Sequence, residues 1–303
     1  MGAIRNVPHP FPYQGSKRQL ASQIVECVPE ATHRLIEPFV GSGAITLASA
    51  HLRRAEKFWL NDLHKPLARL WKAILQEPER LANLYERLWR HQRGREREFY
   101  DKVRERFNAS PQPHLFLYLL ARCVKAAIRY NTQGEFNNSP DNRRLGMRPE
   151  SMRFNILRAA ELLKNRTRVT CRDYRQVLAS ASPEDVVYMD PPYQGVCNTR
   201  DHRYCHGVSF HEFVSALRDL NDREIPYIVS YDGRTGDKIH GHPLPRDLNL
   251  EHLEVAVGRS TQATLLGRQH TTVESLYLSP AILARLRGVP KVFAEERDLF
   301  VTL

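Results

Sequence analysis

The sequence predicts an α/β protein in which helices cover both faces of an open sheet. Short apolar runs of strand length alternate with runs of helical spacing, and polar residues follow the strand candidates at their carboxyl ends. A block of helix-like, strongly charged sequence interrupts this alternation. We therefore divide the 303 residues into one domain formed by 1–64 and 156–303 and an insert formed by 65–155.

The first 64 residues predict a helix, a strand, a second helix and a second strand. Ser16 is expected to cap the first helix, whose apolar residues fall on one face. A buried strand over 34–40 leads through Gly41-Ser42-Gly43 into the second helix. Such a glycine turn lets a ligand approach the backbone closely. The second strand, 58–60, ends in Asn61-Asp62.

The spacing between the glycine turn and Asp62 indicates a nucleotide-like ligand. Asp62 follows Gly41 by roughly 20 positions, the offset of a carboxylate that holds ribose hydroxyls. However, the third glycine of the dinucleotide motif would fall on Thr46. The adenosine part of S-adenosylmethionine makes the same demand on an acidic strand end, without a pyrophosphate that needs a helix dipole. The pattern therefore favours S-adenosylmethionine over NAD.

The insert is predicted to be mainly helical. Pro66 is expected to open a helix, and residues 91–98 form a charged segment that is expected to be solvated. Residues 115–128 predict a buried helix that leads into a hairpin at Arg129. A basic loop follows over 140–144. The leucines and aromatic residues of the insert are interpreted as its own small core.

Strands return after the insert. They are expected over 169–174, 186–189, 227–231, 251–257 and 272–278. The last two are expected to be antiparallel neighbours at one edge of the sheet. Ser209 and Glu212 form a capping box for an intervening helix.

Asp190-Pro191-Pro192-Tyr193 follows the apolar strand 186–189 and is the most informative motif in the chain. Prolines cannot continue a strand ladder, so the strand must stop and the carbonyls lie in a stiff turn. Acceptors beside a flat ring suit an enzyme that grips an amino group on a planar heterocycle. The alternative is an ordinary strand-ending turn. Because Gly43, Asp62 and Asp173 also follow strands, we expect them to share one cleft with Asp190.

Composition indicates an acidic partner. The chain has 45 Lys+Arg against 34 Asp+Glu, a net charge of +11 and a pI near 9.6, which suits a polyanion such as nucleic acid. A basic protein without such a partner stays an alternative. The N-terminus carries no apolar signal sequence, and five cysteines without a Cys-x-x-Cys motif fit a reducing cytoplasm. No membrane association is predicted.

No metal site is predicted. The spacing of the His and Cys residues after the Asp-Pro-Pro-Tyr motif does not follow the short-loop patterns of structural zinc. We interpret this segment as a polar, basic loop in which Arg200 and Arg203 face a nucleic-acid strand. The residues considered as ligands are Cys197, His202, Cys205, His206 and His211.

Four stretches in a fixed order resemble the Dam-like (D12-class, α-group) DNA N6-adenine methyltransferase family, from about residue 10 to about residue 280. They are Pro12-Tyr13-Gln14-Gly15-Ser16-Lys17, Glu37-Pro38-Phe39-Val40-Gly41-Ser42-Gly43, Arg129-Tyr130-Asn131-Thr132-Gln133-Gly134-Glu135-Phe136-Asn137 and Asp190-Pro191-Pro192-Tyr193. The resemblance implies a Rossmann-like, S-adenosylmethionine-dependent methyltransferase sheet with a DNA-recognition insert.

The resemblance also implies roles for single residues. The expected cofactor-binding residues are Tyr13, Gly15, Lys17, Glu37, Phe39, Gly41, Gly43, Asp62, Asp173 and Tyr174. Tyr13 and Lys17 would lie near the methionine end, Asp62 at the ribose, and Asp173 with Tyr174 at the adenine. As alternatives, Asp173 is a helix cap and Lys17 a solvated lysine.

The expected catalytic residues are Asp190, Pro191, Pro192 and Tyr193. The Asp190 carboxylate and the Pro191 carbonyl would hold the two amino hydrogens of adenine, and Tyr193 would stack on the flipped base. The expected DNA-binding residues are Arg129, Asn131, Gln133, Asn137, Arg143, Arg144, Arg200 and Arg203. As the alternative for Asn131 and Asn137, both satisfy only the backbone of their turn.

The implied partner is double-stranded DNA, with a companion restriction endonuclease as a further possibility and a monomer as the expected state. Three other functions stay open. An RNA N6-adenine methyltransferase would share the cofactor loop and catalytic motif. A cytosine N4 methyltransferase usually has Ser in place of Asp190. A non-catalytic DNA-binding protein need not keep Asp190 and Tyr193 together.

Overall fold

The computed structural model of the chain describes residues 6–192, 208–235, 238–240, 243–259 and 271–287. Three residues with predicted roles, Tyr193, Arg200 and Arg203, lie outside these ranges, as do four of the five residues considered as zinc ligands. In the described part no helix is both long and apolar enough to cross a membrane.

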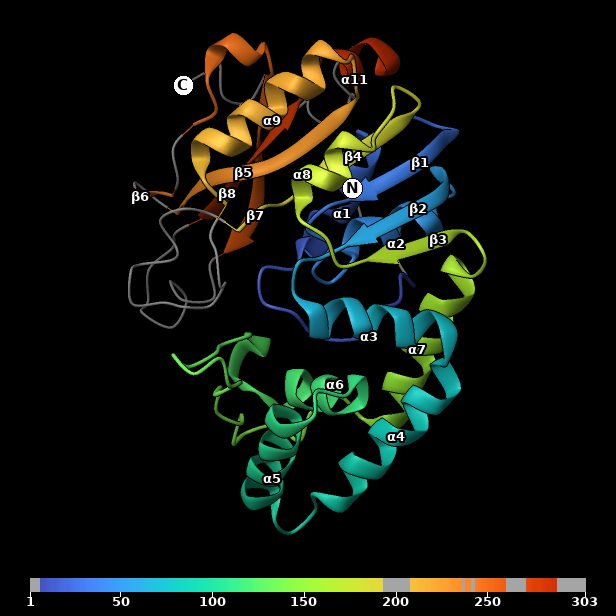
Figure 1. The fold of residues 1–303 in the computed structure, drawn as a ribbon, viewed down its shortest axis with the longest axis vertical. Coiled ribbons are helices and arrows are strands. Elements are labelled where there is room, and N and C mark those ends of the chain that lie inside the picture. Colours follow the sequence, from blue (N-terminus) through green and yellow to red (C-terminus); the bar gives the residue numbers. More distant parts are fainter. Residues whose placement is uncertain (1–5, 193–207, 236–237, 241–242, 260–270, 288–303) are drawn as a thin grey trace.

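The predicted α/β sheet is present (Figure 1). Its strands are β1 (Thr32–Glu37), β2 (Ala55–Asn61), β3 (Thr167–Thr170), β4 (Asp185–Met189), β5 (Tyr227–Thr235), β6 (Lys238–His240), β7 (Glu251–Arg259) and β8 (Thr271–Leu278). The order is β3-β2-β1-β4-β5-β8-β7, and β6 pairs with β5. The strands β1 to β5 are mutually parallel, whereas β8 is antiparallel to both of its neighbours, as expected for the two last strands.

The strand order reverses between β1 and β4. The chain moves outward from β1 through β2 to β3, and then returns to the other side of β1 with β4. In open α/β sheets ligands bind at such a switch point, outside the carboxyl ends of the strands. The glycine loop follows β1 and Asp190 follows β4, so both segments lie at this point.

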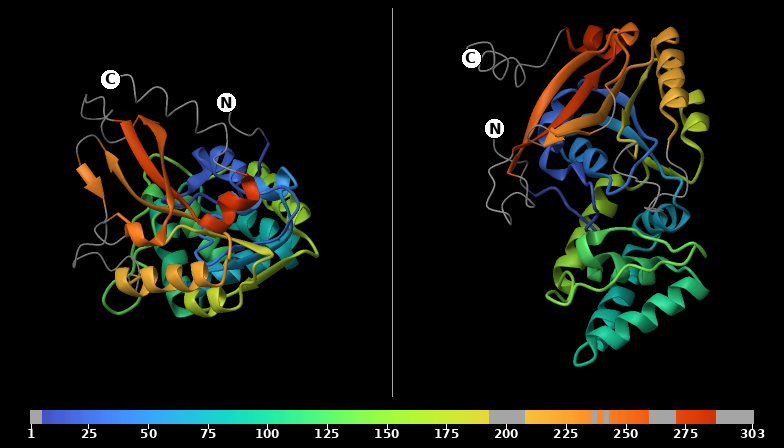
Figure 2. Two further views of the ribbon diagram at one scale, coloured as in Figure 1. Left: turned by 90° about the horizontal axis from the view of Figure 1, so that it is seen from above. Right: turned by 90° about the vertical axis from the view of Figure 1, so that its left-hand side faces the viewer.

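Helices cover both faces of the sheet, as the right-hand view of Figure 2 shows. One face carries α1 (Ala21–Glu26) and α2 (Ala44–His51), and the other carries α8 (Tyr174–Ala179) and α9 (Phe210–Asp222). Alternate strand residues divide between the two layers: Tyr188 packs on the first face, whereas Val187 and Met189 pack on the second. This alternation of side chains along each strand also decides which residues lie beside Asp190.

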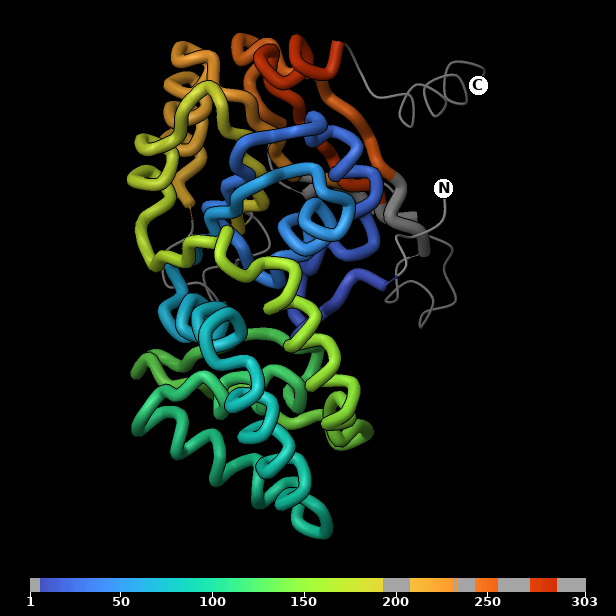
Figure 3. Tube along the Cα trace, turned by 90° about the vertical axis from the view of Figure 1, so that its right-hand side faces the viewer, coloured from blue at the N-terminus to red at the C-terminus, as the bar shows by residue number. Residues whose placement is uncertain are grey.

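The insert is mainly helical, as predicted. It contains α3 (Lys65–Gln76), α4 (Pro78–His91), α5 (Glu96–Ala109), α6 (Pro113–Arg122) and the short turn η2 (Val124–Ala126). The chain returns to β3 through α7 (Pro149–Leu163), which packs on α2, α3 and α4 (Figure 3). Because α7 runs through the expected boundary at residue 155, the division into domains stays a prediction. The remaining short elements are η1 (Lys17–Gln19), η3 (Arg246–Leu248) and α11 (Pro280–Leu286).

Two predicted helix caps are wrong in their chemistry. Ser16 precedes η1, but its hydroxyl lies 2.8 Å from that of Ser42 and makes no cap. The helix predicted after it begins only at Ala21. Ser209 does stand at the N-cap position of α9, yet its side chain makes no cap hydrogen bond. The sequence predicted where helices begin better than it predicted the hydrogen-bond partners of these two hydroxyls.

Two predicted elements end earlier than expected. The helix predicted over 115–128 stops at Arg122, because Cys123 is extended and bridges to Pro140. The strand predicted over 169–174 stops at Thr170, because Asp173 already caps α8. The segment 91–98, predicted to be solvated, is mostly exposed, and α5 begins within it at Glu96.

Candidate active site and nucleic-acid interface

The glycine loop after β1 has a fixed shape. Gly41 and Gly43 have φ values of +46° and +62°, which favour glycine. The indole Nε1 of Trp71 donates to the Gly41 carbonyl at 3.0 Å. A Cβ on Gly43 would stand 2.6 Å from the Trp71 ring. The loop therefore requires both glycines, and α3 of the insert packs directly against it.

Glu37, at the end of β1, supports this loop by holding the first turn of α2. Its side chain is buried, and Oε1 accepts a hydrogen bond from the Thr46 backbone N–H in the first turn of α2 at 2.6 Å. Burial raises the pKa of Glu37 to about 8, although hydrogen bonding from Thr46 opposes this shift, and the charge of Asp190 adds to it. A direct contact between Glu37 and a cofactor stays a prediction, since its visible role is to hold α2 and the loop.

Asp62 lies beside the same loop at the end of β2. Its two carboxylate oxygens accept from the Gly41 N–H at 3.2 Å and from the His64 N–H at 2.9 Å. Burial raises the pKa of Asp62 to about 6, against these two hydrogen bonds. A carboxylate is thus anchored at the glycine loop, in the position that the sequence predicts for a ribose ligand.

The N-terminal motif covers the loop. The Tyr13 ring lies against Gly41, where a Cβ would be 3.1 Å from Tyr13 Cε1. Gly15 has φ +82°, and no described atom would lie within 4 Å of a Cβ there. The backbone N–H of Gln14 donates to the Ala126 carbonyl at 3.1 Å, which ties the motif to the insert. Gly15 is exposed, so the space beside it is open to solvent.

Lys17 joins two carboxylates across three strands. Its Nζ lies 3.2 Å from Oδ1 of Asp190, which follows β4, and 2.9 Å from Oε2 of Glu274 on β8. Lys17 is only 8% exposed, and the two acids are 21% and 24% exposed. The alternative of a solvated lysine is therefore wrong. Sequence reasoning missed Glu274, although an acid that alternates with Leu276 and Leu278 was a readable signal.

The Asp-Pro-Pro motif follows a strand that carries a buried polar pair. Tyr188 is two residues before Asp190 on β4, and its hydroxyl lies 2.9 Å from that of Ser230 on β5. Pro191 is buried and Pro192 is partly exposed. Tyr193 lies outside the residues that the structure describes, so its stacking role stays a prediction.

Two aromatic rings lie where the adenine of a cofactor was expected. Phe39 and Tyr174 have ring centroids 5.2 Å apart, and Phe39 is partly exposed. Asp173 is the N-cap of α8 and pairs with Arg175, whose guanidinium holds the pKa of Asp173 below its usual range. The helix-cap interpretation of Asp173 is thus confirmed as geometry, and its contact with a cofactor stays a prediction.

The hairpin predicted at Arg129 is present. Tyr130 and Phe136 form a bridge, and the Gly134 N–H donates to the Asn131 carbonyl at 3.0 Å. Arg129, Gln133 and Asn137 are exposed. In contrast, the Asn131 side-chain oxygen accepts from the N–H groups of Gln133 and Glu135, at 3.0 Å and 2.8 Å. Asn131 therefore does satisfy the backbone of its turn, and its contact with DNA stays a prediction.

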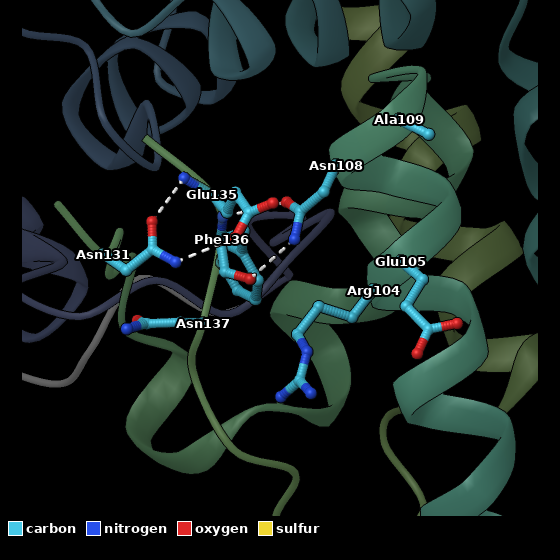
Figure 4. Close-up of a pocket in the computed structure, with 8 residues that line it drawn as sticks. All are labelled: Arg104, Glu105, Asn108, Ala109, Asn131, Glu135, Phe136 and Asn137. Carbon is cyan, nitrogen blue, oxygen red and sulfur yellow. Dashed lines mark hydrogen bonds between the residues drawn. The ribbon is translucent and has the colours of Figure 1, made fainter. Parts of the chain in front are cut away.

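The hairpin is fastened to α5. The Asn108 amide accepts from the Phe136 N–H at 2.8 Å and donates to the Phe136 carbonyl at 3.1 Å, as a neighbouring strand would (Figure 4). A polar hollow opens between the helix and the hairpin. It is lined by Arg104, Glu105, Asn108, Ala109, Asn131, Glu135, Phe136 and Asn137. The exposed hairpin side chains thus sit on a rigid support.

A second basic surface lies beside the hairpin. Arg143 and Arg144 are exposed in the loop predicted over 140–144. The guanidinium of Arg122 is buried and donates to the carbonyls of Asp141 and Arg144, which holds the loop outward. The buried Arg122 thus holds the loop that carries the exposed Arg143 and Arg144.

The turn that follows β2 and the hairpin are in contact through His64. The backbone of His64 donates to Asp62, and its Nε2 lies 2.6 Å from the Tyr130 hydroxyl. Burial lowers the pKa of His64 to about 4, so the ring is neutral near pH 7. In Figure 1 the arrows of β1, β2 and β3 point to the side on which the hairpin lies. The two predicted binding surfaces thus share one side of the molecule.

Within the described residues, no three His, Cys, Asp or Glu side chains are grouped so as to hold a metal ion. Cys27, Cys123 and Cys171 are free thiols.

Comparison with known proteins identifies relatives over most of the chain. Residues 13–256 match the family model of the D12 class N6 adenine-specific DNA methyltransferases. A DNA N-6-adenine-methyltransferase of Escherichia phage P1 is 30% identical over 74% of this chain, although the match spans only 29% of that protein. The DNA adenine methylase of Serratia marcescens is 32% identical over 65% of this chain and 71% of its own length. The type II methyltransferase M.MjaIII of Methanocaldococcus jannaschii is 29% identical, with 62% and 69% covered.

Proposed function

The chain belongs to the family of D12 class N6 adenine-specific DNA methyltransferases, and we propose that the cleft at its β1–β4 switch point transfers a methyl group from S-adenosylmethionine to an adenine of duplex DNA. The observation that carries the proposal is the convergence of Asp190, the glycine loop and Asp62 at one strand edge. These three features come from distant segments of the sequence.

The residues present fit S-adenosylmethionine. Asp62 would accept from the ribose hydroxyls beside the glycine loop that it anchors. Phe39, which is partly exposed and packs on Tyr174, would offer its free face to the adenine, and the buried Tyr174 hydroxyl has no hydrogen-bond partner among the described residues. The open space at Gly15 beside Tyr13 would receive the methionine end. When bound, this cofactor supplies an electrophilic methyl group on a good leaving group.

The protein's task is then to present the adenine amino group. The lone pair of N6 is delocalised into the ring, so the nitrogen is a poor nucleophile. Asp190 and the Pro191 carbonyl would accept its two hydrogens and favour a pyramidal nitrogen with a free lone pair. Lys17 contacts Oδ1 of Asp190, and we assign Oδ2 to the amino group. Alignment and charge placement would provide most of the acceleration.

The target base must leave the duplex to reach Asp190. Gln133 and Asn137 are exposed on the fastened hairpin and are assigned to base edges in the major groove. Arg129, Arg143 and Arg144 would contact phosphates, consistent with a net charge of +11. Arg200 and Arg203 are assigned to the DNA strand from the loop after Asp190.

We extend the proposal to the setting of the enzyme. A monomer with one cleft and one hairpin is sufficient for the reaction. A companion restriction endonuclease fits the relationship to a type II methyltransferase. A cytoplasmic location fits the three free cysteines.

The test is transfer of labelled methyl from S-adenosylmethionine to duplex DNA, to RNA and to a control without nucleic acid. We expect label in adenine of DNA alone, recovered after hydrolysis as N6-methyladenine. Label in RNA, in cytosine, or in no acceptor would reject the proposed function. Competition by unlabelled S-adenosylhomocysteine should suppress the signal.

A further inference from the structure

Glu274 is an acid in the cleft to which none of the predicted roles applies. It lies on β8, two strands away from the β4 strand that carries Asp190. The only charge that it contacts in the described structure is the Lys17 ammonium, at 2.9 Å. Lys17 in turn contacts Asp190 at 3.2 Å. The three side chains form a chain of charges from the edge sheet to the catalytic motif.

The pleat of β8 sets the face on which Glu274 lies. Glu274 alternates with Leu276 and Leu278, which pack in the same layer as Tyr188. Opposite Glu274, the register of β5 shifts between Ser230 and Gly233. The extra residue lies on β5, so the bulge bends β5 beside Glu274 and leaves the alternation of β8 intact.

Gly233 lets β5 and β8 approach closely beside Glu274. It pairs with Glu274, and a Cβ on Gly233 would stand 2.6 Å from the Val273 carbonyl oxygen. Lys17 reaches Asp190 and Glu274 from the N-terminal motif.

Glu274 matters for the state of Lys17 because the Lys17 side chain is buried. Exposed ion pairs contribute little, but a buried ammonium requires charged partners. Without Glu274, the ammonium would draw more strongly on the Asp190 oxygen atoms that the reaction needs as acceptors. With Asp190 at 3.2 Å and Glu274 at 2.9 Å, two carboxylates share the ammonium.

We propose that Glu274 is a positioning residue for methyl transfer: it holds the Lys17 ammonium in place, so that the Asp190 carboxylate keeps both its orientation and its negative charge. The inference rests on the proposed function, because it assigns the amino group to Asp190. Glu274 does not contact the substrate in this account and acts only through Lys17.

The test is single-turnover methylation at saturating cofactor and DNA. We expect Glu274→Gln to lower the rate tenfold or more, while the dissociation constants for cofactor and DNA stay within twofold of wild type. The matched control is Glu254→Gln, an acid on the neighbouring strand β7 that is exposed. It should leave the rate unchanged.

A double mutant separates positioning from a general structural effect. In a Lys17→Met background, Glu274→Gln should change the rate less than twofold, since the residue through which Glu274 acts is gone. Equal losses from Glu274→Gln in both backgrounds would overturn the inference, as would a single variant within twofold of wild type. If Glu274→Gln does not fold, Glu274→Asp provides the same test, with an expected loss of threefold or more.

The outcome is distinguishable from failure of the proposed function. If Asp190→Ala stays active, the proposed function fails and the role of Glu274 fails with it. If Asp190→Ala is inactive but Glu274→Gln is as active as wild type, only the inference about Glu274 fails.

Discussion

Single carboxylates at the carboxyl ends of the strands differ in their partners. Glu37 ends β1, Asp62 follows β2 and Asp190 follows β4, and these three strands are neighbours. Glu37 accepts from the first turn of α2, Asp62 accepts from the glycine loop, and Asp190 contacts Lys17. In the proposed function, the same functional group would serve as support, as a ligand for ribose and as an acceptor for the substrate amino group.

The pKa of Asp62 predicts how cofactor binding depends on pH. Burial raises this pKa to about 6, so the carboxylate is largely neutral below pH 6 and ionised above pH 7. Because the ionised form accepts more strongly from ribose hydroxyls, affinity should rise as the pH rises through about 6 and then level off. Calorimetric titration between pH 5 and about 8 measures this.

Asp62→Asn should abolish that pH dependence and weaken binding by about 1.5–3 kcal/mol, with DNA affinity unchanged. A cofactor affinity equal to that of the wild type at pH 8 would show that Asp62 only serves the turn.

At the scale of elements, the glycine loop is predicted to tolerate no side chain at residue 43. Gly43→Ala would place a Cβ 2.6 Å from the Trp71 ring. We expect a loss of about 1–3 kcal/mol in the free energy of unfolding, together with weaker cofactor binding. Chemical denaturation measures the former.

Gly94→Ala is the matched control for this effect. Gly94 also has a positive φ, +79°, but no described atom would lie within 4 Å of its Cβ. The control therefore carries the backbone strain without the clash. Equal destabilisation by the two substitutions would argue against the packing of Trp71 as the cause.

The hairpin and the adjacent basic loop are predicted to separate sequence reading from general DNA affinity. Gln133→Ala should relax discrimination at particular base pairs, at about 1–3 kcal/mol each, because its side chain is exposed for base contacts. Arg143→Ala or Arg144→Ala should weaken binding to all DNAs and flatten its salt dependence. Asn131→Ala should instead loosen the turn and weaken binding without a change in preference.

Methylation of a randomised-site library by each variant measures these effects. An unchanged site preference for Gln133→Ala would place the reading of sequence elsewhere in the insert. Unchanged salt dependence for both arginine variants would remove the loop from the phosphate-binding surface.

The elements were predictable where local sequence decides them. The apolar runs that became β1, β4 and β5 are buried on both faces, so composition alone identified them. Helix α5 was not expected, although Tyr100, Val103 and Phe107 are its buried stripe, because charged residues dominate the segment. The early end of α6 depends on the bridge between Cys123 and Pro140, which no local pattern encodes.

At the scale of the whole molecule, the fold brings together residues of which the sequence shows only the order along the chain. The motifs predicted that Gly43, Asp62, Asp173 and Asp190 would share one cleft, and the parallel strand order places all four at the carboxyl ends of neighbouring strands. The sequence did not reveal that Lys17 joins Asp190 to the antiparallel edge, because this pairing depends on the neighbourhood of β4, β5 and β8. Nor did it reveal the contact between His64 and Tyr130, which joins the cofactor side to the hairpin.

The most direct test of the account is single-turnover methylation by Asp190→Ala, measured beside its affinities for S-adenosylmethionine and for DNA. Asp190 is assigned to the adenine amino group alone, and Lys17 retains Glu274 as a partner in this variant. We therefore expect methylation to be abolished while both dissociation constants stay close to those of the wild type. A rate within about tenfold of wild type, equivalent to only about 1.4 kcal/mol, would contradict the central role of Asp190.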